Sequence, residues 1–127
     1  MAITVTTQTL VDGSTNIVVK CQLVSGAAAD VTAQQLLDVS TFSAAPAKVK
    51  IMQIHGGGSD FDIDLHWDAT TDVDIMTLPV GEFFYDFRSI GGLINNAGTG
   101  VTGDIMFTSR GAAADSECTI ILYLRVS

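Results

Sequence analysis

Hydrophobic and polar residues alternate along most of this chain, and the alternation is clearest over residues 61–68. Successive side chains of a β-strand point to opposite faces, so a period of two predicts a strand with one buried face. The other face is then exposed to solvent or contacts a partner. The buried face would hold Phe61, Ile63, Leu65 and Trp67, and the other face Asp62, Asp64, His66 and Asp68.

Similar runs recur at intervals of about 8 to 14 residues and are separated by turn-forming residues. Asp12-Gly13, between two runs rich in β-branched residues, predicts a hairpin. Gly56-Gly57-Gly58 is expected to end a strand, and residues 34–38 fit either a short strand or a helical turn. The expected strands cover residues 3–11, 15–24, 34–39, 47–54, 61–69, 73–78, 82–87, 104–110 and 118–126.

This spacing predicts an all-β fold, an antiparallel β-sandwich of the jelly-roll type with about eight to ten strands. The 127 residues, 47% of them hydrophobic, fit a single domain over residues 1–127. Residues 1–10 are expected to form either an edge strand or an extending arm that adds to a partner's sheet. Ile3, Val5 and Thr7 are therefore candidate contact residues.

The formal net charge of −8, with only six Lys and Arg residues scattered along the chain, argues against direct nucleic-acid binding. The first residues lack the charged and apolar regions of a signal peptide. No apolar run approaches the roughly 18 to 20 residues of a membrane helix, so no membrane partner is expected.

The acidic run beginning at Asp60 resembles the opening of a calcium-binding EF-hand loop. It departs from that pattern because Leu65 stands where the loop needs glycine, and Thr71 where it needs a bidentate glutamate. A solvated or partner-facing acidic surface is therefore the better interpretation of Asp62, Asp64 and Asp68. No metal and no cofactor is predicted.

Catalytic chemistry finds little support in the sequence. His66 has only His55 as a second histidine, and no Cys-x-x-Cys pair accompanies them, so a zinc site is not expected. His66 is predicted to be a solvent-facing strand residue. No nucleophile, base and orienting group can be assembled, and we predict that the chain is not an enzyme, with no catalytic residues.

Two cysteines, Cys21 and Cys118, share the parity of apolar neighbours in strand-like runs. Free cysteine is often buried as a small hydrophobic residue, which predicts two buried, reduced thiols. A disulfide between neighbouring strands is the alternative and would be unusual in a chain made in a cytoplasm.

The segment Gly91 to Gly103 contains five glycines and two asparagines. It fits either a plain long turn or a protruding contact loop, because loops of this length in compact domains are often functional. Leu93, Asn95 and Asn96 are its candidate contact residues.

An aromatic run lies between residues 83 and 87. Phe83, Tyr85 and Phe87 share one face, which we expect in the core. Phe84 points to the other face and, with the neighbouring Arg88, could cover part of a subunit interface, where aromatic residues are enriched.

Several segments are similar to small virion structural proteins of tailed bacteriophages. The resemblance lies in residues 67–73 (WDATTDV) and 90–105 (IGGLINNAGTGVTGDI), and in residues 12–19 and 121–125. It covers most of the chain and rests on structural motifs of moderate specificity. The resemblance implies an assembly role in a phage particle and supplies no catalytic residues.

We therefore expect a capsid decoration or cement protein, a homotrimer that binds a major capsid protein, located in the virion and assembled in the host bacterial cytoplasm. A head-tail or tail ring component is the first alternative. A carbohydrate-binding β-sandwich module is the second, although Trp67 shares the parity of the core. The candidate contact residues are Ile3, Val5, Thr7, Asp62, Asp64, His66, Asp68, Phe84, Arg88, Leu93, Asn95 and Asn96.

Overall fold

A computed structural model of the chain describes residues 3–26, 30–43, 48–58, 61–111 and 115–126. These residues form nine strands and two short 3₁₀ turns. The strands are β1 (Ile3–Asp12), β2 (Asn16–Ser25), β3 (Gln34–Leu37), β4 (Val49–Gly58), β5 (Asp62–Trp67), β6 (Val73–Leu78), β7 (Gly81–Asp86), β8 (Ile105–Arg110) and β9 (Ser116–Val126). The turns are η1 (Val39–Thr41) and η2 (Arg88–Ile90).

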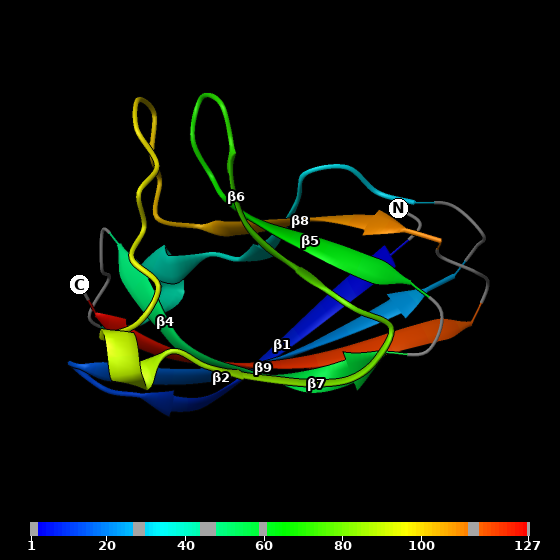
Figure 1. Cartoon of the computed structure of the whole chain (residues 1–127), viewed down its shortest axis with the longest axis horizontal. Coiled ribbons are helices and arrows are strands. Elements are labelled where there is room, and N and C mark those ends of the chain that lie inside the picture. Colours follow the sequence, from blue (N-terminus) through cyan, green and yellow to red (C-terminus); the bar gives the residue numbers. More distant parts are fainter. Residues whose placement is uncertain (1–2, 27–29, 44–47, 59–60, 112–114, 127) are drawn as a thin grey trace.

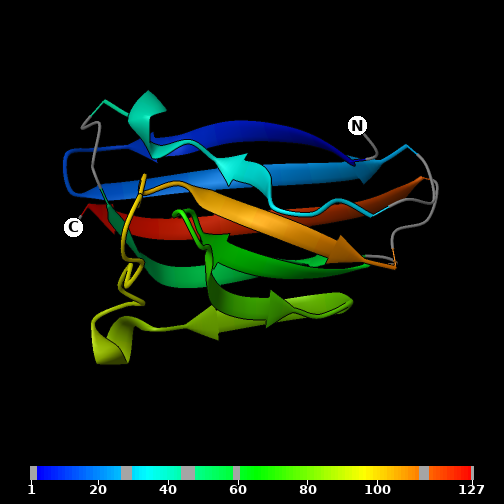
Figure 2. The ribbon, with the colours of Figure 1, turned by 90° about the horizontal axis from the view of Figure 1, so that it is seen from above.

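The strands form two layers, visible edge-on in Figure 1 and from above in Figure 2. One sheet has five strands in the order β1-β2-β9-β4-β7, and the other has four in the order β3-β8-β5-β6. Every neighbouring pair is antiparallel. The all-β antiparallel sandwich predicted from the sequence is confirmed, and the number of strands falls within the predicted range.

Strand pairing is nested from the ends of the chain towards its middle. β2 pairs with β9, β3 with β8, β4 with β7, and β5 with β6, alternating between the two sheets. A hairpin folded over on itself produces this order, which is consistent with a jelly roll built of two Greek keys. β1 lies outside the nested set and extends the five-stranded sheet beside β2.

The core lies between the sheets and follows the predicted parity. Phe61, Ile63, Leu65 and Trp67 are each no more than 2% exposed. Burial of one such side chain stabilises the folded state by about 1.5–3 kcal/mol. Because the period-two pattern buries many of them between the sheets, it is the main source of fold stability. Cys21 and Cys118 are also buried, and both are free thiols.

The triple glycine forms the last three residues of β4, whereas the sequence-based expectation ended this strand at Ile54. β4 continues through Gly56 and Gly57 to Gly58, paired with β9 on one side and β7 on the other. A Cβ on Gly56 would lie closer than 3.0 Å to the carbonyl oxygen of Thr119. Glycine is therefore needed inside the strand because a neighbouring backbone approaches too closely for a side chain.

The segment 34–38 takes the strand alternative that the sequence left open, and the helical turn comes directly after it. β3 is a strand of four residues, and the Asp38 carboxylate then caps η1 by accepting a hydrogen bond from the Ser40 backbone N–H. At the N-terminus, residues 3–12 form an edge strand paired with β2 rather than a detached arm. The first two residues lie outside the described part of the chain.

Candidate contact surfaces

The candidate residues of the sequence analysis do not converge on one site. They fall on four separate surfaces of the sandwich: the β1 edge, the outer face of the four-stranded sheet, a pair of loops at one end, and the outer face of the five-stranded sheet near β7. Two further surfaces, a group of basic residues and a strip of apolar side chains, were not predicted from the sequence.

On the outer face of the four-stranded sheet, the acidic side chains are bonded to neighbouring strands. The Asp64 carboxylate accepts hydrogen bonds from the Thr77 hydroxyl at 2.6 Å and from the Arg110 guanidinium at 2.8 Å. Asp62 pairs with Arg110 in the strand register. The acidic strand therefore has its charge partly compensated within the chain. Asp60, at the start of the acidic run, lies outside the described residues.

His66 is held between strands instead of pointing freely into solvent. Its Nδ1 lies 2.7 Å from Asp74 Oδ1 and its Nε2 lies 3.0 Å from Thr108 Oγ1. The side chain is 14% exposed. These contacts join β5 to β6 and β8, so a structural role accounts for the residue. Within the described ranges, no group of three or more His, Cys, Asp or Glu side chains is placed to hold a metal ion.

Two loops project together from one end of the sandwich (Figure 1). We call residues 68–72 and 98–104 the two-loop projection. The Asp68 carboxylate accepts a hydrogen bond from the Thr102 hydroxyl at 2.7 Å, and the Thr70 N–H donates to the Thr99 carbonyl at 3.0 Å. The loops therefore support each other, and Asp68 belongs to this support.

The first half of the glycine-rich segment lies against the sandwich. The backbones of Leu93 and Ile51 exchange hydrogen bonds of 2.8 and 3.0 Å. Asn95 is buried, and its Oδ1 accepts a hydrogen bond from the Ala97 N–H at 3.0 Å. Only Asn96 of the three candidates named here is exposed, so a partner would meet Asn96 and the projecting tip.

Phe84 and Arg88 lie at the β7 border of the five-stranded sheet. Phe84 is 59% exposed and meets the His55 ring edge-on, with ring centroids 5.4 Å apart. Arg88 makes a bidentate ion pair with Asp86, with contacts of 2.8 and 3.0 Å. Hydrogen bonds from Arg88 lower the pKa of Asp86 to about 2. A surface hollow of about 570 Å³ lies beside Phe84, lined also by His55, Gly56, Gly57, Glu82 and Phe83.

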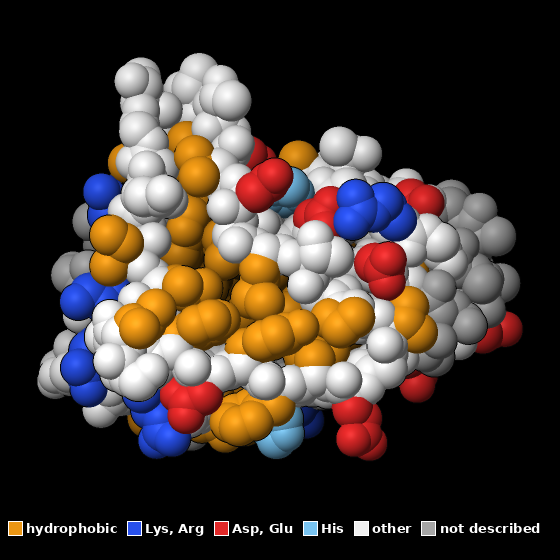
Figure 3. Space-filling model, viewed as in Figure 1, with side chains coloured by type: hydrophobic (Ala, Val, Ile, Leu, Met, Phe, Trp, Pro, Cys, Tyr) orange, Lys and Arg blue, Asp and Glu red, His pale blue; other side chains and the backbone are white. Residues whose placement is uncertain are grey.

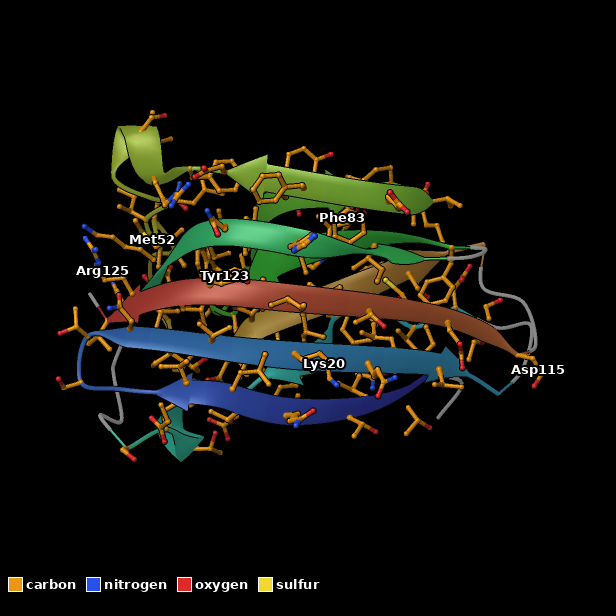
Figure 4. The ribbon with its side chains drawn as sticks, turned by 90° about the horizontal axis from the view of Figure 1, so that it is seen from below. Lys20, Met52, Phe83, Asp115, Tyr123 and Arg125 are labelled. Carbon is orange, nitrogen blue, oxygen red and sulfur yellow. The ribbon has the colours of Figure 1, made fainter. Side chains whose placement is uncertain are left out.

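Basic residues that are scattered in the sequence gather on the outer face of the five-stranded sheet. Lys50 and Arg125 are cross-strand neighbours on β4 and β9, and Arg88 and Arg125 line one hollow of about 280 Å³. Figure 4 shows Met52, Tyr123 and Arg125 at this end of the sheet, with Asp115 at the opposite end. The sequence did not predict this grouping, because it depends on the pairing of β4 with β9, two strands that are far apart in the chain.

A strip of apolar side chains lies along the open side of the sandwich, where β6 and β7 are the edge strands of the two sheets. We call Ile75, Met76, Tyr85 and Phe87 the apolar strip. All four are only partly buried against the core, and Figure 3 shows a continuous hydrophobic surface across this side. The Tyr85 and Phe87 rings stack 6.4 Å apart. The predicted parity of these aromatics holds, but no strand within the described residues lies over Tyr85 and Phe87, which are therefore only partly buried.

Trp67 is 2% exposed, so the single tryptophan is not a platform for a sugar. The described residues contain no helix of the length and hydropathy needed to cross a membrane. A scan against protein-family models and a search of curated proteins found no match to this chain.

Proposed function

We propose that this chain is a structural protein of a phage virion that decorates and stabilises the capsid through protein–protein contacts. The observation that carries the proposal is the apolar strip, which leaves aromatic and aliphatic side chains partly open to solvent on one side of the fold. Contiguous exposed apolar surface is typical of interaction sites, and interface cores are rich in aromatic residues and methionine.

The apolar strip suits a contact that needs little reorganisation. Its side chains come from β6, from β7 and from Phe87 directly after β7, and the stacked rings of Phe83, Tyr85 and Phe87 restrict one another. A surface ordered before binding loses less conformational freedom when the partner docks, which favours affinity. The two-loop projection adds a polar, self-supported tip at one end of the sandwich.

The partner class follows from the resemblance of residues 67–73 and 90–105 to small virion proteins of tailed phages. Under this proposal the partner is the major capsid protein. Each contact can be weak, because many linked contacts on a lattice together bind more tightly than any one of them alone. The homotrimer expected from the sequence would match a local threefold position, and a head-tail or tail ring would instead contain six or twelve copies.

Binding to capsids tests the proposal. Capsids lacking this protein, purified from the phage that encodes it, would be mixed with the full chain, sedimented, and imaged by electron cryomicroscopy. We expect saturable binding and density at regular positions on the capsid surface. Density confined to the portal or tail would favour the ring alternative, and absence of binding would reject an assembly role on the particle.

Two adjacent substitutions on β7 separate the apolar strip from the opposite face. Tyr85→Asp places a charge in the strip, whereas Phe84→Asp places the same charge on the outer face of the five-stranded sheet, where Phe84 is already 59% exposed. We expect Tyr85→Asp to weaken capsid binding at least about tenfold and Phe84→Asp to change it less than about twofold. The reverse order would assign the contact to the outer face. Thermal melts of both variants check that the fold is retained.

A further inference from the structure

Strand β1 is an edge strand whose one protective feature is a bulge between Thr9 and Val11, so its stretch from Ile3 to Thr9 is regular and open to pairing. Natural edge strands are commonly short, charged or interrupted by proline. β3 has four residues, β6 carries Asp74, and β7 carries Glu82 and Asp86. β1 has ten residues, and its stretch 3–11 (ITVTTQTLV) contains neither a charge nor a proline.

The free edge of β1 is held in a strand conformation and presented to solvent. β2 pairs with it on both sides of the bulge between Thr9 and Val11, and no other backbone hydrogen bond to residues 3–12 occurs in the described part of the chain. Side chains fix its ends, since the Gln34 amide donates to the Ile3 carbonyl at 3.1 Å and the Asp12 carboxylate accepts from the Ser43 N–H at 3.0 Å. Between these ends, residues 4–11 are exposed apart from the half-buried Val5.

Exposed hydrophobic side chains are concentrated at this edge. Leu10 and Val11 on β1 are each 47% exposed, and Val24, which pairs with Thr4, is 40% exposed. They are three of the seven large hydrophobic side chains that stand exposed among the described residues. An edge that offers both unpaired backbone groups and apolar side chains is suited to receiving another strand.

We propose that β1 pairs with β1 of a second copy of this chain, antiparallel and across a twofold axis at Thr7. The two five-stranded sheets would then continue as one sheet of ten strands. A twofold axis perpendicular to the sheet keeps each side chain on its own face, so Thr7 lies opposite Thr7 and Val5 opposite Thr9. This inference replaces the homotrimer expected from the sequence with a twofold dimer, whereas binding of the chain to a capsid does not depend on it.

Self-complementarity selects a second copy as the occupant. With the axis at Thr7, residues 5–9 pair within the regular stretch, and the bulge and the Asp12 carboxylates stay outside this pairing, whereas an axis at Gln8 would bring Leu10 of the bulge opposite Thr6 and Asp12 opposite Thr4. Leu10 of each copy comes near Thr4 and Val24 of the other, whereas Ile3, a contact residue in the sequence-based prediction, is 0% exposed and stays in the core. Cross-strand threonine pairs can share hydroxyl hydrogen bonds, and no like charges face each other.

The mass of the full chain in solution tests the pairing. Light scattering or sedimentation from about 5 to about 500 µM should show a concentration-dependent shift from the 13.3 kDa monomer to twice that mass, because a strand-edge interface is small. A monomer over the whole range would overturn the proposal. Three times the monomer mass would also overturn it, since a threefold assembly cannot contain this twofold pairing alone.

Charges at Thr7 test the register. Thr7→Lys and Thr7→Glu each place like charges opposite each other and should abolish the dimer, whereas an equimolar mixture of the two variants should restore it. Thr71→Lys, an exposed threonine in the two-loop projection, adds the same charge elsewhere and should dimerise as the unchanged chain does. A dimer that survives Thr7→Lys, or a mixture that stays monomeric, would reject the axis at Thr7.

Hydrogen exchange gives a second measurement that needs no variant. The outward-facing amides of β1 should exchange at least about tenfold more slowly at high than at low protein concentration, because pairing protects them. The β7 amides, at the opposite border of the same sheet, should show no such dependence. Equal behaviour of both edges would reject β1 as the interface.

Discussion

Replacing Gly56 with alanine tests whether close backbone approach explains the glycines inside β4. Gly56 pairs with Ile120 of β9 and Phe83 of β7, so structured backbone lies on both sides. An added Cβ would lie closer than 3.0 Å to the Thr119 carbonyl oxygen, whereas ordinary van der Waals contact for a Cβ begins at 3.4 Å. One of two hydrogen-bonded strands must therefore move.

The expected loss of stability follows from this geometry. Overpacking costs about 1–3 kcal/mol, and a backbone oxygen cannot rotate away as a flexible side chain can. The change from glycine to alanine also stabilises the folded state by about 0.4–1 kcal/mol, because alanine restricts the conformations of the unfolded chain. We expect a net loss of about 2 kcal/mol, which for a domain of this size lowers the Tm by roughly 6–8 °C.

Two other glycines provide matched controls for this substitution. A Cβ on Gly57 would have its nearest neighbour, the Gly81 carbonyl oxygen, at 3.3 Å, and a Cβ on Gly98 would have nothing within 4 Å. Urea denaturation followed by circular dichroism should rank the losses as Gly56→Ala, then Gly57→Ala, then Gly98→Ala near zero. Equal free energies of unfolding for Gly56→Ala and Gly98→Ala would refute the close-approach explanation.

Two remaining predictions concern the thiols and the projecting loops. Burial raises the pKa of both Cys21 and Cys118 from 9.0 to about 12, so both thiols should resist a thiol reagent at pH 8 and react after unfolding in urea. Because the folded state retains protons that the unfolded state releases, stability should fall as pH rises from about 9 towards 12, and rising or constant urea midpoints over that range would contradict the assignment. Gly100 has φ +79°, and a Cβ there would collide with the Thr70 side chain, so Gly100→Ala should speed amide exchange at Thr70 at least about tenfold. Unchanged exchange would show that the two loops do not depend on this contact.

Local patterns in the sequence were sufficient for most of the strands. The period-two alternation of residues 61–67 assigned each side chain to its face, and Asp12-Gly13 marked the first hairpin, where the Gly13 N–H donates to the Asn16 carbonyl at 3.0 Å. Both signals depend only on neighbouring residues, because alternation and turn geometry are properties of a short stretch of backbone. Gly56 was misjudged for the complementary reason, since its explanation is a carbonyl more than sixty residues away in β9.

The pattern of residues is thus sufficient to specify an all-β chain with a defined inner and outer face for each strand. Which strands are neighbours, and with them every contact surface, depends on how the whole chain folds. Asp64 meets Arg110, and Lys50 lies beside Arg125, because sheet order and register bring distant strands together. The same order leaves β1 and the apolar strip at borders that no further strand of the described residues covers. Sheet order depends on contacts between segments that are far apart in the sequence and pack around a shared core. It therefore cannot be predicted from any single segment.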